Sequence, residues 1–298
     1  MRGLLCAVAM GAVLLACPAA ARAEGKGTVS TEVGAGTARW DGASPADVYS
    51  YERLGISWDP WRRLTFSGLG MVLRERLAGT RYADATTWMF GGGAEIRPTE
   101  ALTFSATAAF APEGPAPGGA RRSLATGMFS ASYEGLTTGP FETEIVATCG
   151  VGHLALSAPG GVSATVDQWS IGGTVTETLD DFTDVSLTVT GYLYGGDTSI
   201  FRSAGGRVGS RMSGMAPYQV SVRPEITRSG DSYVATGYWQ VASLIDGAGH
   251  ETLAGAEVHY LATRAFSPMI GVEGSLRTTE SGTAPSALVL VGARLRLN

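Results

Sequence analysis

Segments of alternating polarity recur along the whole chain, and the connections between them alternate between short and long. The short connections are 59–63, 98–100, 136–139, 179–182, 229–231 and 263–268. The long, Gly-rich connections are 41–47, 78–85, 112–121, 153–161, 196–215, 244–250 and 280–284. Tight turns at one end and long loops at the other are typical of an antiparallel barrel that crosses a membrane. An even strand number closes the sheet, so that no unpaired edge lies in lipid.

The alternating segments predict an all-β fold, a closed antiparallel up-and-down transmembrane β-barrel of about 14 strands. Soluble sandwiches use strands of roughly five or six residues, whereas a tilted strand needs about 9–11 residues to cross hydrocarbon. These segments are long enough to cross. The expected strands are 27–40, 48–58, 64–77, 86–97, 101–111, 122–134, 140–152, 162–177, 183–195, 216–227, 231–243, 251–262, 267–279 and 285–297.

Each expected strand has an apolar face and a polar face. In 285–297, Val289 and Val291 alternate with Arg294 and Arg296. Because successive side chains point to opposite sides of a sheet, the apolar face is expected to meet lipid and the polar face a wet lumen. Aromatic residues gather near the ends of the apolar faces, as in the girdles at a membrane interface.

The first residues predict export. Arg2 precedes an uncharged run at 4–17, which at about fourteen residues is too short to span a bilayer as a helix. Ala21, Arg22 and Ala23 resemble a signal-peptide cleavage site. We therefore expect a signal peptide at 1–23 and a single barrel domain at 24–298. Lipidation at Cys17 is an alternative that the sequence leaves open.

Charge and cysteine content narrow the function classes. Loss of Arg2 and Arg22 with the leader leaves 20 basic and 27 acidic residues, a net charge of −7 that argues against a nucleic-acid partner. Loss of Cys6 and Cys17 leaves Cys149 without an intrachain disulfide partner. We interpret Cys149 as a small apolar strand residue.

With these features, the chain resembles the bacterial outer-membrane β-barrels, and by strand count and size the fourteen-stranded monomeric porins. The resemblance is architectural, covers 24–298 and rests on no family motif. It implies an outer-membrane location with both termini in the periplasm. It also implies outer-membrane lipids, the barrel-assembly machinery and small polar solutes as partners. Fourteen-stranded fatty-acid transporters are similar too, but a first strand beginning almost at Glu24 leaves no room for their N-terminal plug.

Catalysis is not favoured by the sequence. His153 and Ser157 would lie about 13 Å apart on one strand, too far for direct proton transfer. His250 stands in a polar loop where a metal site is conceivable, but a solvated loop is the simpler interpretation. His259 is expected beside Glu257 on the lumen face. We expect no enzyme activity, no cofactor and no metal, while an outer-membrane lipid-modifying enzyme remains a lesser alternative.

Charged residues on the expected inner faces are the functional candidates, because unpaired charges are too costly to bury in a dry interior. A wet lumen with both signs would orient polar solutes, and this favours a porin-like channel for passive diffusion of small polar solutes or ions. A structural or surface-binding barrel whose salt bridges close the lumen is the alternative. The candidate pore-lining residues are Glu32, Arg53, Arg74, Arg76, Glu95, Glu142, Glu144, Arg223, Glu225, Glu257, His259, Glu273, Arg277, Arg294 and Arg296.

The longest loop, 196–215, is the candidate gate. It carries Arg202, Arg207 and Arg211, and its glycines let it fold inward. We expect these arginines to meet lumen acids such as Glu257 or Glu273, each contact contributing about 1 kcal/mol or less if solvated.

Overall fold

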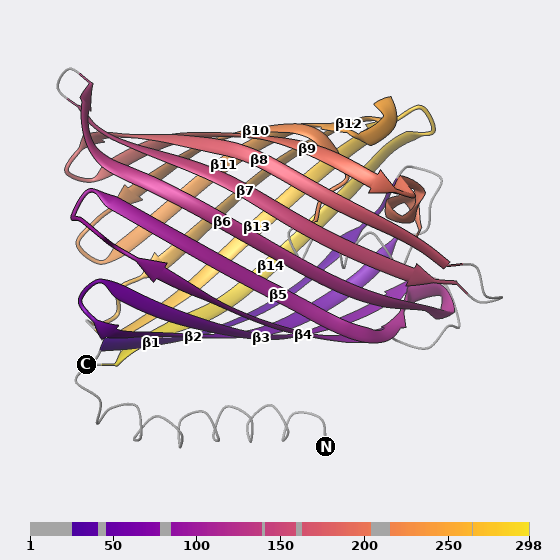
Figure 1. Ribbon diagram of the computed structural model, residues 1–298, viewed down its shortest axis with the longest axis horizontal. Coiled ribbons are helices and arrows are strands. Elements are labelled where there is room, and N and C mark those ends of the chain that lie inside the picture. The colour runs from indigo at the N-terminus through magenta and orange to yellow at the C-terminus, as the bar shows by residue number, and fades with distance from the viewer. Residues whose placement is uncertain are drawn as a thin grey trace.

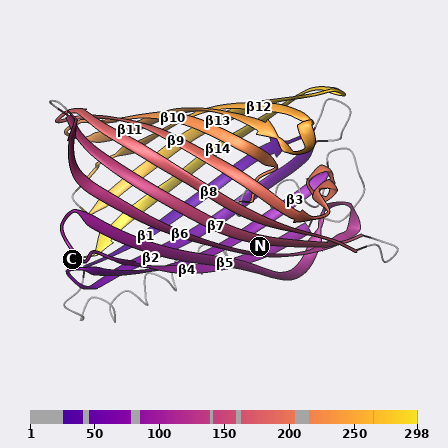
Figure 2. The ribbon, with the colours of Figure 1, turned by 45° about the horizontal axis from the view of Figure 1, so that its top comes forward.

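The predicted fold is confirmed by a computed structural model, in which all 14 strands form one closed barrel (Figure 1). The structure describes residues 26–40, 46–77, 85–138, 141–158, 163–203, 215–263 and 265–297. The expected signal peptide and Cys17 lie outside these residues. Each strand pairs with its sequence neighbour, and the first strand pairs with the last. The strands run obliquely to the barrel axis (Figure 2).

The strand bounds follow the alternating segments closely, and several strands extend further into the loops. The strands are β1 Lys26–Ala38, β2 Asp47–Trp61, β3 Leu64–Leu77, β4 Ala85–Ile96, β5 Leu102–Ala116, β6 Ala120–Thr138, β7 Phe141–Ser157, β8 Ser163–Asp180, β9 Thr183–Gly196, β10 Tyr218–Ser229, β11 Tyr233–Leu244, β12 Gly249–Tyr260, β13 Phe266–Thr279 and β14 Gly282–Leu297.

Closure depends on the alternating pattern at the end of the chain. β14 pairs antiparallel with β1 from Gly27–Leu297 to Thr37–Ala287, without a bulge. The start of β1 and the end of β14 therefore lie with the short turns, at the left of Figure 1. Ser30 faces Arg294 across this ladder and Val33 faces Val291, so the seam keeps one polar and one apolar face.

Within the described parts of the chain, the short helical turns all lie at the loop end of the barrel. They are η1 Pro117–Gly119, η2 Thr198–Arg202 and η3 Ile245–Gly247. Over the same described parts, no helix has the length and hydropathy that a membrane span requires.

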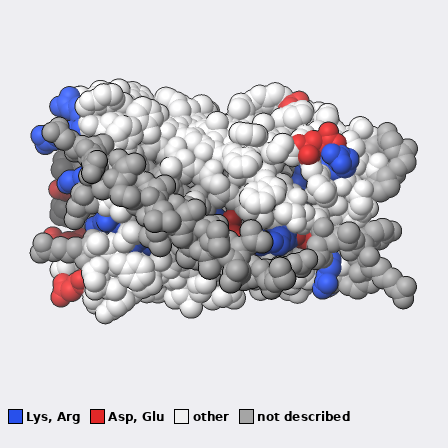
Figure 3. Space-filling model, turned by 90° about the horizontal axis from the view of Figure 1, so that it is seen from below, with Lys and Arg blue, Asp and Glu red and all other residues white. Residues whose placement is uncertain are grey.

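The outer face is a broad apolar surface. Ile171 and Leu193 are each 72% exposed, and Trp88 is 56% exposed, which would be unfavourable for such side chains in water. Most of the charged side chains visible in Figure 3 lie near the two ends of the barrel, and the band between them is largely uncharged. This surface suits lipid around the barrel wall.

The inner face is identified by contacts that cross the barrel. Leu73 on β3 and Leu154 on β7 lie four strands apart, yet they belong to one buried cluster with Trp40 and Phe201. Side chains on such distant strands can meet only on the concave side of the wall. Because residues paired across a ladder share a face, the pairing registers then assign each strand's inner positions.

Candidate functional site: the barrel interior

The turn half of the interior is hollow. A cavity of about 730 Å³ lies against the inner wall formed by β1–β8 and β14. Its polar lining includes Arg53, Arg294 and Arg296, together with serine and threonine hydroxyls. Glycines keep this wall thin, with Gly91 on β4 and Gly150 on β7 among the lining residues. The hollow half can therefore hold water beside a basic wall.

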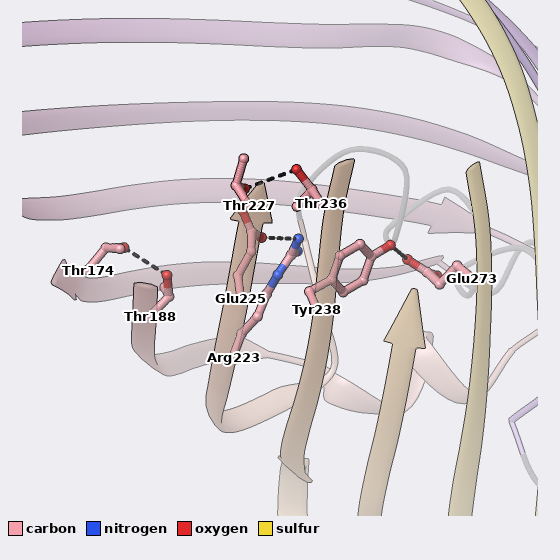
Figure 4. A network of polar contacts seen from close by, with 8 residues as sticks. All are labelled: Thr174, Thr188, Arg223, Glu225, Thr227, Thr236, Tyr238 and Glu273. Atoms are coloured by element: carbon pink, nitrogen blue, oxygen red, sulfur yellow. Dashed lines mark hydrogen bonds and ion pairs between the residues drawn. The ribbon is translucent and has the colours of Figure 1, made fainter. Parts of the chain in front are cut away.

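The opposite wall carries a polar network on β8–β13 (Figure 4). Arg223 donates to Glu225 at 2.8 Å, and its guanidinium lies 3.9 Å from the ring centroid of Tyr238. Tyr238 donates in turn to Glu273 at 2.9 Å. Hydroxyl pairs continue the network on neighbouring strands, at Thr174–Thr188 and Thr227–Thr236. The network presents both charge signs to the lumen.

The loop half of the interior is packed. An apolar cluster joins residues of β1–β8 and β14 with residues from the loops. Leu73 and Leu154 are 0% exposed, and Phe201 and Met215 are 1% exposed. A cluster of this burial excludes water from the part of the loop half that it fills, along β1–β8 and β14.

Part of the packed half comes from a bend in the wall. The ladder between β4 and β5 stops at Phe90–Phe110, and β5 then bulges relative to β6 between Ala111 and Gly114. Beyond the bulge, the tip of the β5–β6 hairpin lies against β3, where a Cβ on Gly118 would come within 3.9 Å of Leu77. The hairpin thereby narrows the lumen at the loop end.

Two ion pairs between described residues are buried in the packed half. Arg122 on β6 contacts both carboxylate oxygens of Glu75 on β3 and donates to Thr87 on β4 at 2.8 Å. The Glu75 and Arg122 side chains are 0% and 1% exposed. Arg277 similarly donates to Glu251 at 2.6 and 3.1 Å. Breaking one partner of such a pair would leave an uncompensated buried charge.

In the described part of the 196–215 loop, η2 and Met215 pack into the buried cluster inside the barrel through apolar side chains. Asp197 begins the helix by accepting a hydrogen bond from the backbone N–H of Ser199 at 3.0 Å, and hydrogen bonding from Ser199 lowers the pKa of this carboxyl. Phe201 packs edge-on against Tyr194, with ring centroids 5.8 Å apart. Met215 fills the space over Gly152, where an added Cβ would lie 2.7 Å from the Met215 Cγ.

Arg202 makes a different contact from the one expected of the loop arginines. The Arg202 guanidinium lies 5.8 Å from the ring centroid of Trp40, and no ion pair joins it to Glu257 or Glu273 within the described chain. Arg207 and Arg211 lie outside the described residues. Burying a phenylalanine contributes about 2–3 kcal/mol, more than an exposed ion pair does. Apolar seating therefore holds the plug, which we define as η2 with Met215.

The structure places most of the candidate pore-lining residues on the inner face. Tyr51 donates to Glu32 at 2.5 Å, and His259 contacts Glu257. Arg294 and Arg296 lie in the wall of the hollow half. By position or register, the inner candidates are Glu32, Arg53, Glu95, Glu142, Glu144, Arg223, Glu225, Glu257, His259, Glu273, Arg277, Arg294 and Arg296.

The inward placement of Arg74 and Arg76 is wrong. Arg74 pairs in register with Ser50 and donates to the outer-face residue Glu52 at 2.8 Å. The alternate β3 residues Met71, Leu73 and Glu75 point inward. The physical reason is the packing of the loop half: where the lumen is filled with apolar side chains, an apolar residue no longer marks the lipid face.

Sequence reasoning missed the inward acids Glu75 and Glu251 and the arginine Arg122. Glu75 stands between Arg74 and Arg76, so its opposite facing was visible once the arginines were assigned outward. The contact of Glu75 with Arg122 depends on the bend of the β5–β6 hairpin, for which Pro112 was the available signal.

The histidines are dispersed. His153 lies on the outer face opposite Asp167, with Nδ1 and Oδ1 2.7 Å apart. Ser157, the nearest serine considered, instead lies 3.3 Å from Ser163, measured between hydroxyl oxygens. No group of three or more His, Cys, Asp or Glu side chains suited to a metal ion occurs in the described ranges.

No family model and no curated protein matches the sequence. Solved structures do match. The CymD monoaromatic hydrocarbon channel has a TM-score of 0.55 at 9% identity, covering 91% of this chain and 88% of that one. The TodX deltaS2S3 mutant monoaromatic hydrocarbon channel has a TM-score of 0.52 at 10% identity, covering 92% and 90%. At these identities the matches establish the shared fold, the closed barrel expected from the resemblance to outer-membrane proteins.

Proposed function

We propose that this barrel is an outer-membrane channel for passive diffusion of small polar solutes, with its short turns and both termini in the periplasm. One observation carries the proposal: the hollow half holds a cavity of about 730 Å³, lined in part by arginines and hydroxyl groups, inside an apolar outer wall. A barrel that served only as an anchor would gain nothing from keeping Arg53, Arg294 and Arg296 beside an unfilled space.

In this function the plug is the gate. In this account, solutes enter the hollow half from the turn end, and the loop end opens when Phe201 and Met215 leave the positions in which they pack. Because the seat is apolar, the closed state is the stable one, and openings are infrequent. The lumen residues Arg294 and Arg296 then bias which ions enter.

A closed structural barrel is the second candidate, and the buried Glu75–Arg122 and Glu251–Arg277 pairs favour it. The first pair joins β3 to β6, and the second joins the neighbouring strands β12 and β13, whether or not solutes pass. Surface binding through the loops would be the function of such a barrel.

Planar-bilayer recording separates the two candidates. The channel account predicts a small, infrequent conductance for the purified protein and a larger, steadier one when 198–212 is deleted. Folding of both proteins is checked by the different gel mobility of boiled and unboiled samples. If both fold and neither conducts, the channel proposal fails and the closed barrel takes its place.

A further inference from the structure

The hollow half carries charged side chains without an ionic partner, and they fall into two groups of opposite sign. The acidic arc lies on the inner faces of β6, β7 and β9 and consists of Glu134, Glu142, Glu144 and Asp184. The basic arc lies on the inner faces of β2 and β14 and consists of Arg53, Arg294 and Arg296. Within the described chain, none of these seven side chains forms an ion pair.

Strand registers place the acidic arc on the lumen side. Asp184 on β9 pairs with Thr227, which belongs to the inner polar network. The ladders between β6 and β9 then put Glu134, Glu142 and Glu144 on the same face. Glu134 and Glu144 stand directly opposite each other. Like charges in that position destabilise a ladder, so a cationic group from a solute would be favourable there.

The remaining inner charges of the hollow half do not cancel this separation. Three acids have ionic partners: Glu95 with Arg97, Glu225 with Arg223, and Glu257 with His259. Beside the basic arc, Asp59 stands in register with Lys26, and Glu32 with Arg53. Glu273 on β13 lies in the wall of a separate, smaller cavity. Toward the turns, the described inner positions of β14–β2 therefore carry four bases against two acids, whereas those of β6–β9 carry four acids and no base.

The two arcs lie on opposite sides of the barrel. β14 is the seventh strand from β7 in either direction around the closed ring. Glu142 and Glu144 stand near the first residue of β7, and Arg294 and Arg296 near the last residue of β14, so both pairs lie toward the turns. A tilted barrel of 14 strands is roughly 28 Å across between backbones, and side chains reaching inward from both walls bring the charged groups closer together.

We propose that the hollow half accepts elongated zwitterions, of the class of uncapped peptides of three or four neutral residues. The ammonium end faces the acidic arc and the carboxylate end faces the basic arc. An extended peptide of this length spans about 10–14 Å, which lets its two ends approach opposite walls, whereas the charges of a single amino acid lie too close together to do so. This assignment rests on the proposed channel function and names its solute class.

Ligand-observed NMR titration of the detergent-solubilised barrel at pH 7 tests the assignment with three probes of similar length. Trialanine carries both terminal charges at this pH, trialanine amide keeps only the ammonium, and N-acetyl-trialanine keeps only the carboxylate. Each solvated charge contact is weak, so we expect trialanine to bind about three- to fivefold more tightly than either capped peptide. If either capped peptide binds as tightly as trialanine, one arc acts alone and the assignment is overturned.

Variants assign each end of the peptide to its arc. Glu142→Gln combined with Glu144→Gln should reduce the advantage of trialanine over N-acetyl-trialanine, which has no ammonium to lose. Arg294→Gln combined with Arg296→Gln should instead reduce its advantage over trialanine amide. Arg74→Gln removes an arginine from the outer face and is the matched control, which should leave all three affinities unchanged. If the first two double variants retain both advantages, while their gel shifts show folded barrels, the assignment is wrong.

Conductance is measured separately in KCl without peptide, so the two proposals can fail independently. A conducting protein that binds the three peptides equally refutes the zwitterion assignment and leaves the channel standing. A protein that prefers trialanine but never conducts refutes the channel and leaves a peptide-binding barrel.

Discussion

The two halves of the barrel interior use the same wall strands for opposite purposes. Toward the turns, many inner positions are glycine, hydroxyl-bearing or charged residues, and they surround a cavity of about 730 Å³. Toward the loops, inner positions such as Leu73 and Leu154 are fully buried against Phe201. The comparison shows that a strand's pattern does not by itself decide whether its lumen is open. What fills the interior is contributed by the loops and by the bent β5–β6 hairpin.

The largest expected effect lies in the packed half. Glu75→Ala leaves the Arg122 guanidinium, 1% exposed, without its carboxylate. We expect the free energy of unfolding to fall by roughly 3–5 kcal/mol. The measurement is the urea midpoint at which the unboiled gel band is lost.

Glu52→Ala is the matched control, because it breaks an ion pair to Arg74 on the outer face, with side chains 37% and 45% exposed. Solvent screens this pair, and its loss should cost about 1 kcal/mol or less. Similar losses for Glu75→Ala and Glu52→Ala would mean that the loop half is not dry.

The second prediction loosens the plug. Phe201→Ala removes the ring that packs against Tyr194, and truncation of a buried phenylalanine costs about 3–5 kcal/mol. If part of that loss destabilises the closed position of the plug, the fraction of time that the channel is open should rise by a factor of ten or more, because about 1.4 kcal/mol corresponds to a tenfold change in an equilibrium. Single-channel open probability is the measurement.

Phe110→Ala makes the same truncation on the outer face, where Phe110 is 53% exposed. Its open probability should match that of the unaltered barrel. An equal rise in both variants would place the gate elsewhere.

The third prediction concerns the hollow half. Arg294→Glu reverses a charge on the cavity wall, and we expect the ratio of cation to anion permeability to increase several-fold with little loss of stability. Reversal potentials in a KCl gradient measure this ratio. Arg76→Glu reverses a charge on the outer face and should leave the ratio unchanged; a shift of equal size there would remove the hollow half from the ion path.

The smallest effect is a pH dependence of the plug. Hydrogen bonds from Ser199 lower the pKa of Asp197, so the charged form stabilises the start of η2. A lowered pKa contributes stability above the ordinary aspartate range and loses it as the pH falls below about 4. Open probability should therefore rise modestly on acidification. In Asp197→Asn that rise should disappear; an undiminished rise would assign the pH effect to another group.

Much of this fold could be predicted from the sequence, because lipid on one side and water on the other impose a strict alternation. The alternation correctly predicted the inward face of the strands where they line the hollow half, as at Arg294 and Arg296 on β14. It failed at Arg74 and Arg76, where Leu73 and Leu77 fill the interior and the outer face carries charge near the loops. Apolar side chains point outward only where the interior is filled with water. Where the interior is itself apolar, apolar side chains can point inward and charged ones outward.

The alternating polarity of the sequence could not predict which residues hold the plug in place. Phe201 stands in a Gly-rich loop with no periodicity, and three arginines were its most conspicuous neighbours. Phe201 packs against Tyr194 of β9, and Met215 fills the space over Gly152 of β7. Only the folded barrel brings these positions to one place, so the apolar contacts of η2 and Met215 were not predictable from the sequence.

Cysteine accessibility tests the contrast between the two halves most directly. In a Cys149→Ser background, Met128→Cys places a thiol on the inner wall of the hollow half, where Met128 is 51% exposed. Leu154→Cys places one on the inner wall of the packed half, where Leu154 is 0% exposed. A charged, water-soluble thiol reagent should label Met128→Cys rapidly and Leu154→Cys slowly, and adding Phe201→Ala should accelerate only the second. If both thiols were labelled at equal rates in the barrel with Phe201 intact, the account of a hollow half and a packed half would be contradicted.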